Sequence, residues 1–216
     1  MLLCLMAWMQ IFLMVIDFSI DEFLGGKLKI KQPKKGYRAG IDPVLLAASV
    51  NASKGDNILE LGCGVGVASL CLAKRVAGLN IYGVEIQSDY AALATENSQL
   101  NSMDLNVVSA DIGRMPDSIK QLQFDHVMAN PPYFERLAST MSFNRGRDAS
   151  RILKTPLSDW VSVIAQRLKQ RGWAHLIYRI DRFDKLFPLL TARFGSFVLT
   201  PIVPRKDREA ELIMIH

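Results

Sequence analysis

The 216-residue chain contains only three cysteines, Cys4, Cys63 and Cys71, and only three histidines. No two cysteines form a CxxC pair, and no group of cysteine and histidine has the spacing of metal ligands. This scarcity argues against a disulfide framework and against a zinc-binding module. We therefore expect no metal and a reducing, cytoplasmic setting, in which Cys63 and Cys71 are small apolar fillers.

The chain also lacks internal repeats and low-complexity linkers, so residues 18–216 are expected to form a single domain. Residues 1–16 carry no charge and are almost wholly apolar. They have neither the positively charged start nor the small-residue cleavage site of a signal peptide. A membrane span needs about twenty apolar residues, and acidic residues from Asp17 onward interrupt this one, so stable membrane association is not expected. Residues 1–17 are interpreted as an apolar extension. Three interpretations of this extension remain. It docks on the domain, it is an artefact of a start placed upstream of the real one (Met14 is a plausible real start), or it anchors the protein to a membrane or a partner.

Positive charge is in excess. The formal net charge is +5 and the sequence pI is about 9.2, which favours an anionic partner. The basic residues gather in two blocks, residues 27–38 and residues 145–154, and such blocks suit contacts with phosphates. Solvated surface lysines remain the alternative interpretation of the first block. The candidate RNA-binding residues are Lys34, Lys35, Arg145, Arg147 and Arg151.

Helix and strand patterns alternate from residue 42 onward, which is typical of a parallel α/β sheet. Strands are expected at residues 57–61, 80–85, 105–108, 124–129 and 173–178. Helices are expected to start at Asp42-Pro43, Val67, Ser88, Thr155-Pro156 and Asp181 and to end near residues 50, 76, 100, 169 and 194. Residues 197–203 and 211–215 then form a closing antiparallel pair. The predicted fold is α/β: a doubly wound, mostly parallel, seven-stranded sheet with an antiparallel terminal strand.

A glycine loop, Gly62-Cys-Gly-Val-Gly66, joins the first of these strands to a helix. This arrangement is typical of a nucleotide-binding corner, since Gly62, Gly64 and Gly66 allow the backbone to approach a ligand closely. A dehydrogenase would favour GxGxxG, but the third residue after Gly64 is Val67. The loop therefore favours a nucleoside with an amino-acid tail over a pyrophosphate.

Three acids stand at successive strand ends. Glu60 precedes the glycine loop by two residues and suits a cationic ligand, and Glu85 ends the next strand, where a carboxylate can accept both ribose hydroxyls. Asp111 follows the third strand and is positioned for the exocyclic amine of an adenine. Each acid alone could be a helix cap or a surface residue. Their shared position favours a nucleoside site.

The end of the fourth strand carries Asn130-Pro131-Pro132-Tyr133. An exocyclic adenine nitrogen, or an amide nitrogen, is a poor nucleophile because its lone pair is delocalised. The Asn130 side-chain carbonyl and the Pro131 carbonyl can accept its two hydrogens, and the prolines stiffen the turn so that the acceptors are preorganised. Tyr133 offers a ring for stacking a flipped base. The alternative is a turn stiffened by proline without chemistry.

These motifs together resemble those of the tRNA1(Val) adenine-N6 methyltransferases, in the branch of methyltransferase small domain proteins. The resemblance covers about residues 18–216 and includes the segment 32–46, which leads into the first helix. It implies a class I, Rossmann-like fold and S-adenosylmethionine as cofactor. It further implies that Tyr37, Arg38 and Asp42 line the methionine end of the cofactor site and that residues 143–151 lie over the acceptor site.

The sequence thus predicts an S-adenosylmethionine-dependent enzyme that methylates N6 of an adenine in RNA, with tRNA as the expected substrate. Three alternatives act on another planar nitrogen: guanine N2 of ribosomal RNA, protein glutamine, and adenine in DNA. Each of these classes usually carries a duplicated half or an additional domain that is not visible in the sequence. A non-catalytic nucleic-acid-binding protein is the alternative of a different class, although such a protein needs neither the Asn-Pro-Pro-Tyr turn nor the three acids.

Overall fold

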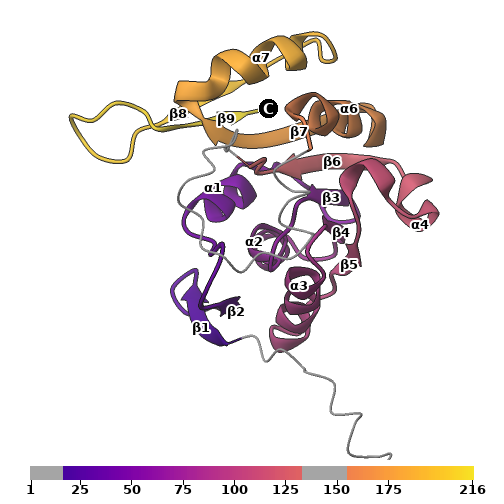
Figure 1. The fold of residues 1–216 in the computed structure, drawn as a ribbon, viewed down its shortest axis with the longest axis vertical. Coiled ribbons are helices and arrows are strands. Elements are labelled where there is room, and N and C mark those ends of the chain that lie inside the picture. The colour runs from indigo at the N-terminus through magenta and orange to yellow at the C-terminus, as the bar shows by residue number, and fades with distance from the viewer. Residues whose placement is uncertain (1–16, 133–154) are drawn as a thin grey trace, which may run out of the picture.

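The computed structural model describes residues 17–132 and 155–216 (Figure 1). Within these ranges, seven strands form one sheet and two further strands, β1 (Phe18–Phe23) and β2 (Leu28–Pro33), form an antiparallel hairpin. The sheet strands are β3 (Asn57–Leu61), β4 (Asn80–Glu85), β5 (Asn106–Ser109), β6 (Phe124–Ala129), β7 (Leu168–Arg179), β8 (Leu199–Ile202) and β9 (Leu212–Ile215). The α-helices are α1 (Asp42–Ser49), α2 (Val67–Arg75), α3 (Ser88–Leu100), α4 (Asp117–Lys120), α6 (Leu157–Arg167) and α7 (Phe183–Thr191). Two short 3₁₀ turns are η1 (Ile112–Arg114) and η2 (Ile180–Arg182).

The strand order is β5-β4-β3-β6-β7-β9-β8. β3 pairs in parallel with β4 on one side and with β6 on the other, while β9 runs antiparallel to both β7 and β8. The predicted mostly parallel, seven-stranded sheet with one reversed strand is therefore confirmed. Since the strand order reverses at β3, a crevice opens beside its carboxyl end, where sheets of this kind bind ligands.

Helices cover both faces of the sheet (Figure 1). One face buries Leu46 of α1, Leu70 of α2 and Leu93 of α3, and the other buries Ile164 of α6 and Leu190 of α7. Each of these side chains is at most 5% exposed. β3 lies between the two layers and is buried along almost its whole length, as expected for a central parallel strand with apolar residues on both faces.

Several predicted helix boundaries differ from the structure by one or two residues, which is normal for helix ends. Asp42 was expected to cap the first helix, but Ile41 is the N-cap and Asp42 lies in the first turn. α6 ends at Arg167 rather than Lys169, because β7 begins directly at Leu168. Asp181 does not cap α7; it lies in η2, one turn earlier.

The β1–β2 hairpin was not predicted. The signal lies in the alternation of buried Leu28 and Ile30 with exposed Lys29 in β2, after a turn that contains Gly25 and Gly26, both with positive φ. Period-2 alternation after a glycine pair indicates a hairpin. The density of lysines in this segment led to its interpretation as a basic rim instead.

Candidate active site

The glycine loop turns sharply between β3 and α2. Gly62, Gly64 and Gly66 have φ values of 68°, 55° and 85°, a region that favours glycine. A Cβ at Gly62 would lie 2.8 Å from the Trp160 ring, and one at Gly66 would lie 3.2 Å from Leu105. At Gly64 a Cβ would meet nothing within 4 Å, so this backbone faces open space. The loop is therefore packed against the protein at Gly62 and Gly66 and is open toward a ligand at Gly64.

Glu60 is a buried acid at the end of β3. It is 4% exposed and accepts hydrogen bonds from both the backbone N–H and the hydroxyl of Ser69, at 3.0 and 2.5 Å. Burial, assisted by the charge of Glu85 and opposed by the hydrogen bonds from Ser69, raises the pKa of Glu60 to about 8. A cation placed against this carboxyl would be strongly favoured, because it would compensate the cost of burying the charge.

Glu85 is a second buried carboxylate at the end of β4, and it is 5% exposed. Its two oxygens accept from the backbone N–H groups of Gly64 at 2.9 Å and Gln87 at 2.8 Å. Burial raises the pKa of Glu85, and the backbone hydrogen bonds from Gln87, Gly64 and Ile86 oppose that rise. The bond to Gly64 ties the carboxylate to the open part of the glycine loop.

Asp111 follows β5 and caps η1, accepting from the N–H of Gly113 at 2.9 Å. The N–H of Ala110 donates to the carbonyl of Glu85 at 2.9 Å, so the ends of β5 and β4 lie side by side. With Glu60 on β3, the three acids predicted from the sequence stand on three neighbouring strands, at the same edge of the sheet.

A recess of about 70 Å³ opens at this edge. It is lined by Tyr37, Ala39, Pro43, Glu60, Gly62, Cys63, Gly64, Val65, Val67, Ala68 and Asn130. The structure thus brings Asn130, at the end of β6, to the same recess as the glycine loop and Glu60. Pro131 is buried beside it and Pro132 is partly buried, whereas Tyr133 lies outside the described residues.

Tyr37, Arg38 and Asp42, the three residues expected at the methionine end of the cofactor site, lie at different distances from the recess: one lines it and two do not. Tyr37 lines the recess, and its carbonyl accepts from the hydroxyl of Tyr90 at 3.0 Å. The guanidinium of Arg38 instead binds the carboxylate of Asp21 on β1 and the carbonyl of Pro33, so it holds the hairpin rather than lining the recess. Asp42 lies at the start of α1, in the turn that carries Pro43 to the recess.

The predicted RNA-binding residues fall in two places. Lys34 and Lys35 follow β2 and are exposed; Lys34 pairs with Asp17 at 2.9 Å. Arg145, Arg147 and Arg151 lie outside the described residues, as does the rest of the loop expected over the acceptor site.

Sequence reasoning missed two residues that support the recess, Ser69 and Trp160, and it interpreted Cys63 as a small apolar filler. Ser69 holds Glu60, and only its place on the first turns of the helix after the glycine loop hints at this role. Trp160 supports Gly62 from below, and among the described residues its indole nitrogen is the one buried side-chain polar atom without a hydrogen-bond partner. Cys63 lines the recess, but burial raises the pKa of its thiol, so it is not suited to act as a nucleophile.

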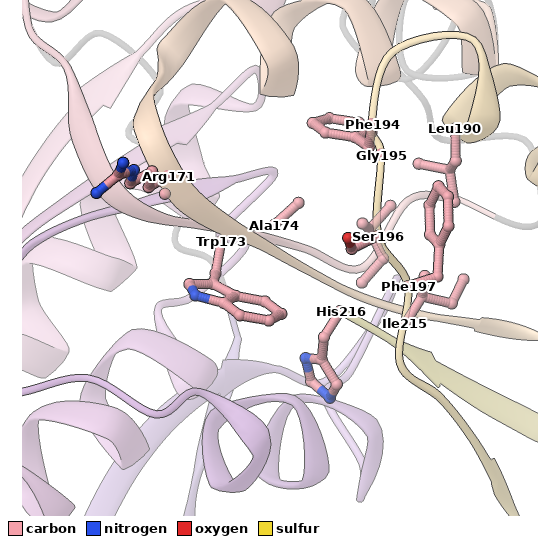
Figure 2. Close-up of a pocket in the computed structure, with 12 residues that line it drawn as sticks. Arg171, Trp173, Ala174, Leu190, Phe194, Gly195, Ser196, Phe197, Ile215 and His216 are labelled. Atoms are coloured by element: carbon pink, nitrogen blue, oxygen red, sulfur yellow. The ribbon is translucent and has the colours of Figure 1, made fainter.

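A larger hollow of about 360 Å³ lies elsewhere, between β7, the end of α7 and the end of β9 (Figure 2). It is lined mainly by apolar and aromatic residues, among them Trp173, Phe194 and Phe197, and no carboxylate side chain of the described residues lines it. Trp173 pairs with His126 near the start of β6, so this hollow lies toward the amino ends of the parallel strands. Neither the three acids nor Asn130 line it, and the smaller recess is the candidate active site.

In residues 17–132 and 155–216, no group of three or more His, Cys, Asp or Glu side chains is arranged to hold a metal ion. None of the helices in the described part of the chain combines the length and the apolar character needed to cross a membrane.

The residues of the recess and of the neighbouring end of β4 fit S-adenosylmethionine. The buried carboxyl of Glu60 suits the cationic amino-acid end, and Glu85 suits ribose hydroxyls. The open backbone at Gly64 allows close approach between them. The recess itself is smaller than a whole nucleoside site, so it would enclose one end of the ligand, with the remainder lying along the ends of β4 and β5.

Comparison with known proteins agrees with this geometry. Residues 39–171 match the methyltransferase small domain family. The tRNA1(Val) (adenine(37)-N6)-methyltransferase of Glaesserella parasuis is 32% identical over 151 residues, which cover 69% of this chain and 62% of that protein. The enzyme of the same name from Haemophilus influenzae is 32% identical over 157 residues, covering 71% of this chain and 66% of that protein. The chain therefore spans less than two thirds of the length of these two relatives.

A solved structure shares the fold. A 16S rRNA N2 methyltransferase (RsmC) of T. thermophilus, in complex with AdoMet and guanosine, matches with a TM-score of 0.65 and 20% sequence identity, over 92% of this chain and 49% of that chain. This likeness concerns the fold, which is that of the class I S-adenosylmethionine-dependent methyltransferases. Together with the match over residues 39–171, it confirms the resemblance inferred from the motifs: the chain belongs to the methyltransferase small domain family.

Proposed function

We propose that the protein is an S-adenosylmethionine-dependent methyltransferase that methylates the N6 amine of an adenine in RNA, with tRNA as the substrate. One observation carries the proposal: Asn130, at the end of β6, lines the same recess as Glu60 and the glycine loop. An acceptor for an amine hydrogen therefore lies beside the place that suits the charged end of the cofactor. The tRNA methyltransferases that the chain resembles supply the substrate class.

Each residue of the site would have a separate role in binding or in alignment. The Asn130 side-chain oxygen and the Pro131 carbonyl accept the two amine hydrogens and aim the nitrogen lone pair at the methyl group. Glu60 would hold the amino-acid end of the cofactor, Glu85 would accept from its ribose hydroxyls, and Asp111 would accept from the amine of its adenine. When bound, S-adenosylmethionine supplies an activated methyl on a sulfonium. The residues of the chain would have to align the amine nitrogen with this methyl group, and the amine proton would leave to water. Alignment therefore provides most of the catalysis, without a strong base.

The predicted roles of residues outside the described ranges belong to the same proposal. Tyr133 would stack the flipped adenine, and Arg145, Arg147 and Arg151 would contact phosphates, as would Lys34 and Lys35. A cytoplasmic location, where tRNA is modified, also remains part of this proposal.

The deciding experiment incubates the protein with isotope-labelled cofactor and separate pools of tRNA, ribosomal RNA, duplex DNA and protein, and identifies the product by mass spectrometry. RNA from cells that lack the enzyme avoids sites that are already methylated. We expect label in N6-methyladenine, in the tRNA pool. Label in N2-methylguanine, methylglutamine or DNA would transfer the function to that substrate, and absence of label from every pool would contradict an enzymatic role.

A further inference from the structure

The outer face of the β1–β2 hairpin combines exposed apolar side chains with lysines. In its antiparallel register Ile20 stands opposite Lys31 and Glu22 stands opposite Lys29. Opposed residues project from the same face of such a pair. Phe18 and Ile20 are 41% and 53% exposed on this face, whereas β2 turns Leu28 and Ile30 into the core. An aromatic ring and an isoleucine therefore stay in solvent although the hairpin has a buried face available.

The lysines of this region leave positive charge available on this face. Lys29 on this face and Lys27 in the turn just before β2 are exposed, and neither forms an ion pair with any residue in the described ranges. Lys31 lies 5.0 Å above the centre of the Phe18 ring and pairs with Glu96 at 2.9 Å. This cation–π contact holds the aromatic ring in place.

Asn97 of α3 and Asn101, the residue that ends this helix, fix the hairpin to the domain. Asn97 accepts from the backbone N–H of Lys31 at 2.7 Å and donates to its carbonyl at 3.0 Å. Asn101, one helical turn later, makes the same pair of bonds with Lys29, at 2.9 and 2.8 Å. The two side chains form hydrogen bonds with backbone groups of β2 in the way that a neighbouring strand would. The hairpin lies beside α3, at the opposite end of the molecule from β8 (Figure 1).

A buried glutamine links the hairpin to the candidate active site. Gln32 is 2% exposed; its amide donates to Asp21 of β1 at 2.7 Å and accepts from the N–H of Ala39 at 2.8 Å. Ala39 lines the recess next to Tyr37. The position of the outer face relative to the recess is therefore set by hydrogen bonds, which suits one ligand that contacts both places.

We propose that the outer face of the hairpin binds an unpaired stretch of RNA next to the methylated nucleotide. One base stacks on Phe18, Ile20 extends the apolar platform, and Lys27 and Lys29 contact backbone phosphates. The combination of a ring with flanking cations fits single-stranded nucleic acid, in which every nucleotide offers a planar base and a charge. A purely apolar partner would leave the lysines without a role. The inference rests on the proposed function, because it assigns this face to the same RNA substrate.

The test compares Phe18→Ala, the double variant Lys27→Gln/Lys29→Gln and the control Lys206→Gln. Lys206 is an exposed lysine between β8 and β9, at the far end of the molecule. The probes are a 12-nucleotide single-stranded RNA of mixed sequence and an unmodified tRNA transcript. Removal of the stacking ring should weaken RNA binding by about 5- to 150-fold. The double lysine variant should reduce the slope of log affinity against log salt by on the order of 0.7 for each phosphate that is no longer neutralised.

The control should bind both RNAs like the wild type. In methylation assays the hairpin variants should raise the KM for tRNA and leave kcat and cofactor affinity nearly unchanged, because the recess is intact. The thermal unfolding temperature of each variant is compared with that of the wild type. Equal temperatures show that the substitutions, all at exposed positions, have not unfolded the protein. Asn101→Ala, which keeps Phe18 and both lysines but frees the edge of β2, should also weaken RNA binding.

Two results would overturn the inference: RNA affinity and KM unchanged in the hairpin variants, or binding to anionic phospholipid vesicles that Phe18→Ala abolishes while RNA affinity stays the same. The proposed function fails separately. If the wild type methylates no RNA, the enzymatic assignment fails, but the binding of the two RNA probes still decides the role of the hairpin.

Discussion

His175 on β7 and His126 on β6 share a hydrogen bond, with Nε2 of the former 2.9 Å from Nδ1 of the latter. His175 Nδ1 lies in turn 2.8 Å from His216 Nδ1, and His126 Nε2 lies 3.3 Å from the carboxylate of Asp56. When His126 is neutral, a donation from its Nε2 to Asp56 leaves its Nδ1 as acceptor, so that His175 donates from Nε2 and accepts from His216. All three histidines of the chain form one hydrogen-bonded row across β6, β7 and the end of β9.

This row predicts that the protein loses stability in mild acid. Burial, together with repulsion from the neighbouring His216 and His126, lowers the pKa of His175 to about 3. In the unfolded chain a histidine titrates near 6.5. Between pH 6.5 and about 3 the unfolded state thus binds a proton that the folded state does not. The free energy of unfolding should fall by up to about 1.4 kcal/mol per pH unit from this group as the pH drops below 6.5.

Urea unfolding at pH 7.5, 6.5, 5.5 and 4.5 measures this effect. His175→Gln keeps a polar amide but removes the titration, so its stability should fall less steeply over the same range, although it starts lower. Parallel curves for the wild type and the variant would show that His175 does not carry the pH dependence.

The sequence predicted the parts of the site that depend on local spacing. The glycine loop, Glu60, Glu85 and Asn130 follow strands whose apolar patterns are clear, and parallel strands bring their carboxyl ends to one edge. Contacts between distant segments could not be predicted in this way. Asn97 binds the backbone of a residue 66 positions away, and His126 meets His175 across 49 positions. Neither residue belongs to a motif, and each depends on which strands and helices become neighbours.

Glu85 should be needed for cofactor binding. Glu85→Ala removes the buried carboxylate expected to accept the ribose hydroxyls and also the bond to the N–H of Gly64. We expect the affinity for S-adenosylmethionine to weaken by about 2–3 kcal/mol, the range for hydrogen bonds to a charged group. Titration calorimetry measures this, and Asp104→Ala, an exposed acid between α3 and β5, is the matched control. Unchanged affinity in Glu85→Ala, or tight binding of NAD by the wild type, would contradict the assignment.

Cofactor binding should release a proton from Glu60. With its pKa raised to about 8, this carboxyl is largely protonated at pH 7 in the free protein. A cationic amino-acid end placed beside it favours the charged form and lowers the pKa. Binding at pH 7 should therefore release up to one proton, and binding above about pH 9 should release almost none.

Calorimetry in two buffers of different ionisation enthalpy, phosphate and Tris, counts the protons. Glu60→Gln should bind more weakly and release no proton, while Ser69→Ala should raise the pKa of Glu60 further, because it removes a hydrogen bond that favours the carboxylate. Equal binding enthalpies in the two buffers at pH 7 would place the cation away from Glu60.

Asn130 should be needed for turnover far more than for cofactor binding. Its side chain lines the recess at the end of β6, where the two prolines hold it, and its oxygen is the acceptor that aligns the amine of the substrate. Asn130→Ala removes a preorganised polar partner at the reacting centre, so kcat should fall by at least about a hundredfold. Affinity for S-adenosylmethionine should change only a few-fold, since Glu60, Glu85 and the glycine loop remain. Asn51→Ala, at an exposed asparagine just after α1, is the matched control and should retain full activity. Single-turnover assays with saturating tRNA isolate the chemical step. A near wild-type rate in Asn130→Ala would mean that the turn after β6 serves the fold alone and that another group aligns the substrate nitrogen.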